Sequence, residues 1–187
     1  MPNWCANYLT VRGPEGAVRD FLVAVCADPD TGEGFSLERG LPMPVASEDG
    51  TFPDGFDVLE WCRSRWGTKW EVDADVLALT PGEATWAFSS AWSPPDLWLA
   101  YMVDRHPDLT MVLESMELGV DFIGVAVGSG GHTTRFQWGA SELHDLVAGH
   151  QDIGEPGITL YERFRDELEG CLDDAEDSAV EESESHV

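Results

Sequence analysis

The fold is decided by a strand–turn–strand–helix pattern in residues 70–96, WEVDADVLALTPGEATWAFSSAWSPPD. Residues 70–79 predict a strand with one buried face, because residues 70–76 alternate apolar and acidic side chains. Pro81-Gly82 predicts a turn, and residues 84–92 predict the partner strand of a hairpin. Residues 93–96 predict a helix start, with serine as N-cap and proline in the first turn. The hairpin should therefore run directly into a helix.

The flanking regions extend this pattern into an α+β fold. Residues 4–11 alternate like a strand, and an apolar stripe at helical spacing follows Gly13-Pro14. Residues 57–66 predict a helix before the hairpin, and residues 109–117 predict a strand after the helix that follows the hairpin. Without the inserted helix the order is β-α-β-β-α-β. That is the order of a ferredoxin-like fold.

We expect the chain to divide into three parts. Residues 1–130 form the ferredoxin-like βαββαβ domain, with a helical insertion at about residues 27–68 and an extra strand at the end. Residues 131–172 form a C-terminal helical extension. Residues 173–187 hold seven acidic residues and no base. Such a run repels itself and buries little surface, so it predicts a disordered acidic tail.

Charge limits the classes of partner. Of 187 residues, 36 are Asp or Glu and 10 are Lys or Arg, which gives a formal net charge of −26. A charge of this sign argues against nucleic acid and against an anionic membrane surface. It favours a basic protein as partner.

The start of the chain and its cysteines point to the cytoplasm. Met1-Pro2-Asn3-Trp4 does not resemble a secretory signal, and no apolar stretch is long enough to span a membrane. The four cysteines are far apart and form no CxxC or Cys/His pair at ligand spacing. We therefore expect reduced thiols, no metal site and no cofactor.

Catalytic motifs are missing. The sequence has no HExxH, no GxxxxGK[ST] and no nucleophile elbow. This favours a protein that is not an enzyme. Two residues keep an enzyme alternative open. Lys69, the single lysine, could act as a nucleophile if desolvated, and Pro2 could act as an N-terminal base if Met1 were removed.

Tryptophans and Lys69 are the first candidate binding residues. The candidates are Trp4, Trp61, Trp66, Lys69, Trp70 and Trp92. One interpretation, which includes Trp86, is an aromatic cluster that fixes the inserted helix on the sheet. The other is a platform that binds a partner. Lys69 would then stack on a neighbouring indole or pair with a carboxylate.

Acidic residues on a late helix are the second set of candidates. Glu162, Asp166 and Glu169 share the exposed side of a helix predicted at residues 160–172. They could form a surface that imitates DNA phosphates and binds a basic site on a host protein. A solvated helix face or an adaptation to high salt would produce the same pattern.

Three segments carry a resemblance to a known family: residues 1–7, MPNWCAN; residues 66–70, WGTKW; and residues 88–95, FSSAWSPP. Together they resemble the YubB ferredoxin-like family of plasmid and bacteriophage proteins, over residues 1 to about 130. The resemblance implies a βαββαβ core and a mobile-element origin. It implies no activity.

The sequence therefore favours a non-catalytic accessory protein of a phage or plasmid that binds a host or mobile-element protein. An acidic inhibitor of the DNA-mimic type is one form of this hypothesis. The alternatives are a small enzyme with a site around Lys69 and the tryptophan-rich motifs, and binding of single-stranded nucleic acid on an open sheet face.

Overall fold

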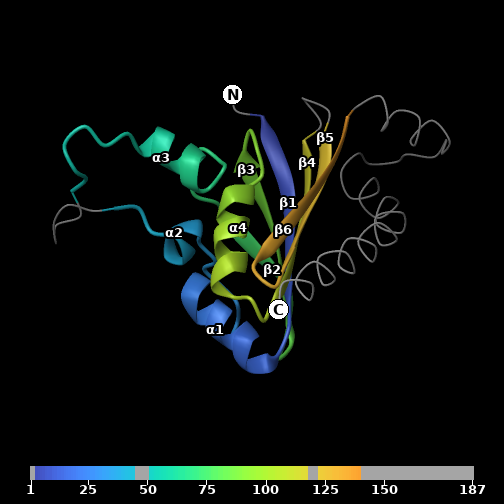
Figure 1. The fold of residues 1–187 in the computed structure, drawn as a ribbon. Coiled ribbons are helices and arrows are strands. Elements are labelled where there is room, and N and C mark those ends of the chain that lie inside the picture. The colour runs from blue at the N-terminus through green and yellow to red at the C-terminus, as the bar shows by residue number, and fades with distance from the viewer. Residues whose placement is uncertain (1–2, 45–50, 118–121, 140–187) are drawn as a thin grey trace.

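A computed structural model describes residues 3–44, 51–117 and 122–139 of the chain. The strands in this part are β1 (Trp4–Arg12), β2 (Ala74–Thr80), β3 (Glu83–Ala91), β4 (Thr110–Glu117), β5 (Phe122–Ser129) and β6 (His132–Gly139). The helices there are α1 (Glu15–Val25), α2 (Leu37–Gly40), α3 (Val58–Arg65) and α4 (Asp96–Arg105). The fold is α+β, as expected (Figure 1).

The described strands form one antiparallel sheet in the order β2-β3-β1-β4-β5-β6. β1 lies in its interior, paired with β3 on one side and β4 on the other. Its residues alternate between two faces, and Cys5, Leu9 and Val11 are buried on one of them. In the register Leu9 stands opposite Trp86 on one side and opposite Leu113 on the other. The apolar positions of three neighbouring strands therefore meet on one face.

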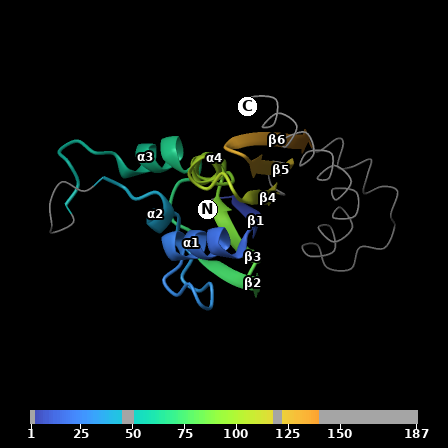
Figure 2. The ribbon, with the colours of Figure 1, turned by 60° about the horizontal axis from the view of Figure 1, so that its bottom comes forward.

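Helices α1 and α4 cover this apolar face (Figure 2). Phe21 of α1 packs against Trp86 of the sheet and against Trp98 of α4, with ring centroids 6.1 Å and 6.5 Å apart. The helices leave the other face of β1 and β3 to small and polar side chains such as Ala6, Thr85 and Ser89. None of the described helices combines the length and the apolar character needed to cross a bilayer.

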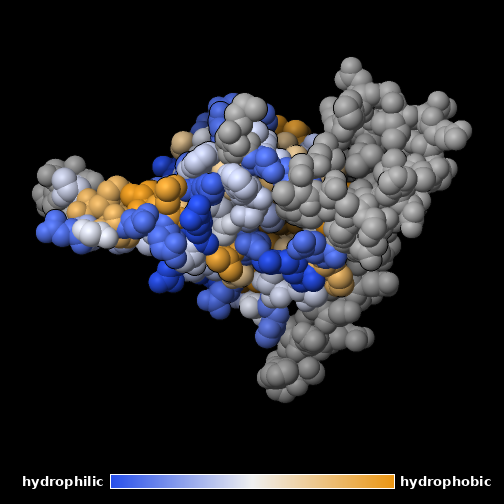
Figure 3. All heavy atoms as spheres, turned by 90° about the horizontal axis from the view of Figure 1, so that it is seen from above, coloured by the Kyte–Doolittle hydropathy of each residue, from blue (hydrophilic) through white to orange (hydrophobic). Residues whose placement is uncertain are grey.

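The segment between α1 and β2 holds α2 and α3, in the stretch where a helical insertion is expected. α3 begins after Asp57, whose side chain caps the helix by accepting a hydrogen bond from the backbone N–H of Glu60 at 3.1 Å. The arm that carries α3 projects from the side of the domain, and part of its surface is apolar (Figure 3). Phe52 and Leu59 are among its exposed side chains.

β6 corrects the predicted C-terminal part. Residues 132–139 form a strand that pairs with β5, although the sequence favours a helical extension from residue 131. The reason is the turn. Gly130 and Gly131 both have positive φ, which a two-residue hairpin turn requires and a helix does not. The rest of the predicted extension, the tail at residues 173–187, and Glu162, Asp166 and Glu169 lie outside the described residues.

Candidate functional site

The three motif segments meet at one end of the sheet. Trp4, at the start of β1, stands opposite Ala91 at the end of β3. Ala91 is held in turn by Thr68: its N–H donates to Thr68 Oγ1 and its C=O accepts from the same hydroxyl, both at 3.1 Å. The backbone N–H of Trp98 donates to the carbonyl of Trp66 at 3.2 Å. The loop after α3 is thus bonded to β3 and to α4.

A buried polar network lies behind this meeting point. Asn7 is 1% exposed, and its Nδ2 donates to the Cys5 carbonyl and to Ser90 Oγ, both at 2.9 Å. Its Oδ1 accepts from Ser115 Oγ at 2.9 Å. Ser90 Oγ donates onward to the carbonyl of Ser93 at 2.8 Å. A buried amide needs partners for its donor and its acceptor, and Asn7 finds them on neighbouring strands. The network therefore links β1, β3 and β4 to the loop before α4.

Gly67 is a position where only glycine fits. Its φ is +87°, and a Cβ added there would lie 3.1 Å from the carbonyl oxygen of Pro94 and overlap Asp96. The hydroxyl of Ser93 donates to the Gly67 carbonyl. The close approach of the loop to the start of α4 therefore depends on this glycine.

We expect Gly67→Ala to lower the free energy of unfolding by about 2 kcal/mol, from left-handed strain and steric overlap together. Gly55→Ala is the matched control, because Gly55 also has a positive φ, +76°, but its Cβ would meet nothing within 4 Å. The control should lose only the strain energy, about 1 kcal/mol. Urea denaturation measures both. Equal losses for the two variants would show that the loop does not press on α4.

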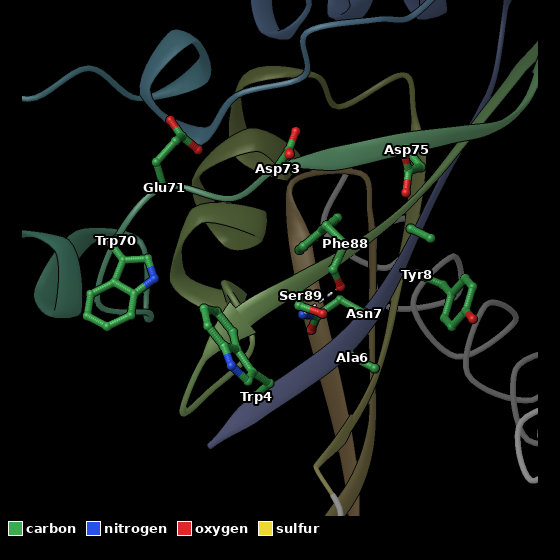
Figure 4. A pocket seen from close by; sticks show the side chains of 11 residues that line it. Trp4, Ala6, Asn7, Tyr8, Trp70, Glu71, Asp73, Asp75, Phe88 and Ser89 are labelled. Atoms are coloured by element: carbon green, nitrogen blue, oxygen red, sulfur yellow. Dashed lines mark hydrogen bonds between the residues drawn. The ribbon is translucent and has the colours of Figure 1, made fainter. Parts of the chain in front are cut away.

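A groove of about 660 Å³ opens on the sheet face that α1 and α4 leave free, at the same end of the sheet (Figure 4). Its floor comes from β1 and β3 and includes the short side chains of Ala6, Ala87 and Ser89, and its rim comes from the loop before β2 and the start of β2. The lining residues are Trp4, Ala6, Asn7, Tyr8, Trp70, Glu71, Asp73, Asp75, Ala87, Phe88 and Ser89. None of these residues is basic.

Two indoles stand at the groove. Trp4 is 53% exposed and Trp70 is 40% exposed. Their ring centroids are 6.3 Å apart with an interplanar angle of 66°, an edge-to-face arrangement. Both residues are sequence candidates, and the structure brings them together although they are far apart in the chain.

The other aromatic candidates divide between core and surface. Trp66 is buried, and its Nε1–H donates to the Leu41 carbonyl at 2.9 Å. Trp61 packs edge-to-face on Trp66 at 5.3 Å. For Trp61 and Trp66 these contacts support the other interpretation, an aromatic cluster that holds α3 and the insertion onto the domain. Trp92 is exposed and has a φ of +75°, in the left-handed region.

Lys69 uses its ammonium group to cover Trp92. Its Nζ lies 4.1 Å from the ring centroid, which is a cation–π contact. Lys69 lines neither the groove nor the cleft described below. The enzyme alternative centred on Lys69 stays a hypothesis, and Pro2 lies outside the described residues.

The carboxylates of the rim have two different roles. Glu71 accepts hydrogen bonds of 2.7–2.9 Å from Ser36 Oγ and from the backbone N–H groups of Leu37, Glu38 and Val72. It therefore anchors the N-terminus of α2 to the rim. Asp73 and Asp75 are exposed, and within the described part of the chain neither has an ion-pair partner.

A second, smaller cleft of about 260 Å³ lies on the helix side of β4 to β6. Arg135 of β6 forms a salt bridge with Asp96 at its edge. Burial raises the pKa of Asp96, and the guanidinium of Arg135 opposes that shift. The ion pair ties β6 to the start of α4.

The described cysteines Cys5, Cys26 and Cys62 are free and buried. Burial raises the pKa of Cys5 to about 12 and that of Cys26 to about 11. Both stay protonated near neutral pH and are poor nucleophiles. Among residues 3–44, 51–117 and 122–139, no group of three or more His, Cys, Asp or Glu side chains is placed to hold a metal ion.

Sequence reasoning missed several groove residues, among them Asp73, Asp75, Tyr8 and Ser89. A signal was present, because the alternation of residues 70–76 places the aspartates on the opposite face from Trp70, Val72, Ala74 and Val76. What the pattern lacks is the pairing of β1 with β3, which turns the unburied faces of both strands into one floor.

Comparison with known proteins supports the α+β fold and gives no information about the site. No family model matches the chain, and no curated protein matches it. The crystal structure of a protein api92 from Yersinia pseudotuberculosis, of the family model DUF1281, is similar with a TM-score of 0.51 and 11% identity. The match covers 75% of this chain and 99% of that one. At this identity the likeness shows the fold alone.

Proposed function

We propose that this chain is a non-catalytic binding module that docks a partner protein in the groove between Trp4 and Trp70. The observation that carries the proposal is the pair of half-exposed indoles beside a floor of small side chains. Exposing an indole to water is unfavourable, and tryptophan is enriched among residues that dominate binding energy at interfaces. The buried network behind the groove keeps its floor rigid, which lowers the entropic cost of binding.

We also infer that β1, α1, β2, β3, α4 and β4 form a ferredoxin-like βαββαβ core. Support comes from the antiparallel order β2-β3-β1-β4 and from helices α1 and α4 on one face. The resemblance of residues 1–7, 66–70 and 88–95 to the YubB ferredoxin-like family then suggests an accessory protein of a plasmid or phage. Its partner would be a host or mobile-element protein.

Site-specific crosslinking tests the proposed function. A photoreactive phenylalanine at Ala87, on the groove floor, should crosslink a partner in cells that contain the protein. The same group at Leu97, which is exposed on α4 outside the groove, is the control. Adding Trp4→Ala and Trp70→Ala to the Ala87 variant should remove the crosslink. A crosslink that persists without both indoles, or none from Ala87, would refute the groove as a docking site.

A further inference from the structure

We propose that the groove recognises the ammonium group of a lysine side chain in an extended, basic segment of the partner. This inference rests on the proposed function and specifies the chemistry of its ligand. Three features of the described residues support it: the arrangement of the indoles, the unpaired carboxylates and the shape of the floor.

The indoles offer exposed aromatic surface to a cation. Trp4 and Trp70 are 6.3 Å apart and inclined at 66°, and both remain open to solvent. An ammonium group within about 6 Å of an indole face is attracted by the ring quadrupole. The chain already makes such a contact nearby, since Lys69 Nζ lies 4.1 Å from the Trp92 ring. Lys69 thus occupies Trp92 and leaves the Trp4–Trp70 pair available.

The carboxylates supply the matching charge. Asp73 and Asp75 line the groove with no ion-pair partner in the described residues, and no lining residue is basic. The oxygens of Glu71 are taken by backbone and hydroxyl donors, so Glu71 positions the rim while the two aspartates face the solvent. A lysine ammonium group on an exposed indole face would therefore lie in a groove that holds two available carboxylates and no basic lining residue.

The floor suits an extended backbone. Ala6 of β1 stands opposite Ser89 of β3, so the groove crosses two strands whose side chains there are short. A peptide lying on small residues can approach closely and point every second side chain toward the rim. The volume of about 660 Å³ falls in the range of ligand-binding clefts.

The test uses the full-length chain and a capped heptapeptide of alternating serine and lysine, acetyl-SKSKSKS-amide. Its matched control carries norleucine, which keeps the alkyl chain and lacks the charge, in place of each lysine. Calorimetric titration gives the affinity, and the indole Nε1–H resonances report which tryptophans are contacted. We expect the lysine peptide to shift the Trp4 and Trp70 resonances and to bind about tenfold more tightly than the norleucine peptide.

Variants of the protein locate the binding energy. Trp4→Ala or Trp70→Ala should weaken the lysine peptide about tenfold, and Asp73→Asn or Asp75→Asn about threefold. Leu97→Ala and Asp104→Asn remove an exposed apolar and an exposed acidic side chain outside the groove, and should change nothing. Added salt should weaken the lysine peptide and leave the norleucine peptide unaffected.

The outcomes separate this inference from the proposed function. If both peptides bind equally, or if the groove variants do not affect the lysine peptide, the lysine inference is wrong. The Ala87 crosslink can still depend on Trp4 and Trp70 in that case, which would leave the binding module intact. If the lysine peptide is not preferred and the Ala87 crosslink does not depend on Trp4 and Trp70, both proposals are wrong.

Discussion

Trp98→Ala is expected to lower the free energy of unfolding by about 4 kcal/mol. The indole is 1% exposed and packs against Phe21 and Phe35, with ring centroids at 6.5 Å and 5.5 Å. Its Nε1–H donates to the Leu37 carbonyl at 3.0 Å. Truncation would therefore open a large cavity and leave a carbonyl of the insertion without its donor. Urea denaturation, followed by far-UV circular dichroism, gives the change.

Two controls divide this loss into its parts. Trp98→Phe keeps a six-membered aromatic ring and removes the pyrrole part of the indole with its Nε1–H donor, so its cost should be about 1–2 kcal/mol, less than that of Trp98→Ala. Leu97→Ala changes the exposed neighbour of Trp98 on α4 and should cost under about 0.5 kcal/mol. A loss below about 1 kcal/mol for Trp98→Ala would mean that α2 and α4 are not packed through this indole.

The local spacing of apolar residues was sufficient to predict the strands and helices that form the core. In residues 4–11, alternation predicts a strand because one face of β1 is buried and the other is not. The apolar stripe at Val18, Phe21, Leu22 and Val25 predicts α1, and these residues are buried as a group. Where only one face of an element is buried, the spacing of its apolar residues shows whether it is a strand or a helix.

Local pattern failed where long-range contacts decide. α4 begins at Asp96, with Pro95 in the N-cap position, whereas the sequence predicts Ser93 as N-cap. The Ser93 hydroxyl donates instead to Gly67, 26 residues away. Similarly, β6 has exposed residues at Thr133, Arg135 and Gln137, so a one-sided apolar pattern is weak there. Its pairing with β5 follows from the Gly130-Gly131 turn.

The candidate site was predictable in its residue types and not in its geometry. Trp66 and Trp70 both flank the same short loop, and nothing in the sequence says which ring is buried. The structure buries Trp66 against the insertion, where Leu41 accepts its N–H, and leaves Trp70 beside Trp4. That choice depends on the path of residues 27–68, a region with few periodic signals.

Asn7→Ala should lower the free energy of unfolding by about 3 kcal/mol. Truncation leaves the Ser115 hydroxyl without its acceptor, and it removes the donor to the Cys5 carbonyl. Each of these groups is buried among β1, β3 and β4, where water cannot easily replace the amide. Ser89→Ala is the matched control on β3, since Ser89 is exposed on the other face, and it should change stability by less than about 0.5 kcal/mol.

A double-mutant cycle distinguishes a network from independent bonds. Ser115→Ala alone leaves Asn7 Oδ1 with only the weak Cys5 Sγ donor at 3.6 Å. Adding Ser115→Ala to Asn7→Ala removes the orphaned hydroxyl, so the double variant should cost about 1 kcal/mol less than the sum of the single variants. Additive losses would show that each group finds water when its partner is removed.

The same network should control the order of the groove. Asn7 holds Ser90, and Ser90 Oγ donates to the Ser93 carbonyl, so the end of β3 that stands opposite Trp4 is fixed through this chain of bonds. In Asn7→Ala the indole Nε1–H resonance of Trp4 should therefore broaden at denaturant concentrations where the protein is still folded, because this end of the sheet opens before the core does. An unchanged Trp4 resonance up to global unfolding would contradict the link between the buried amide and the groove.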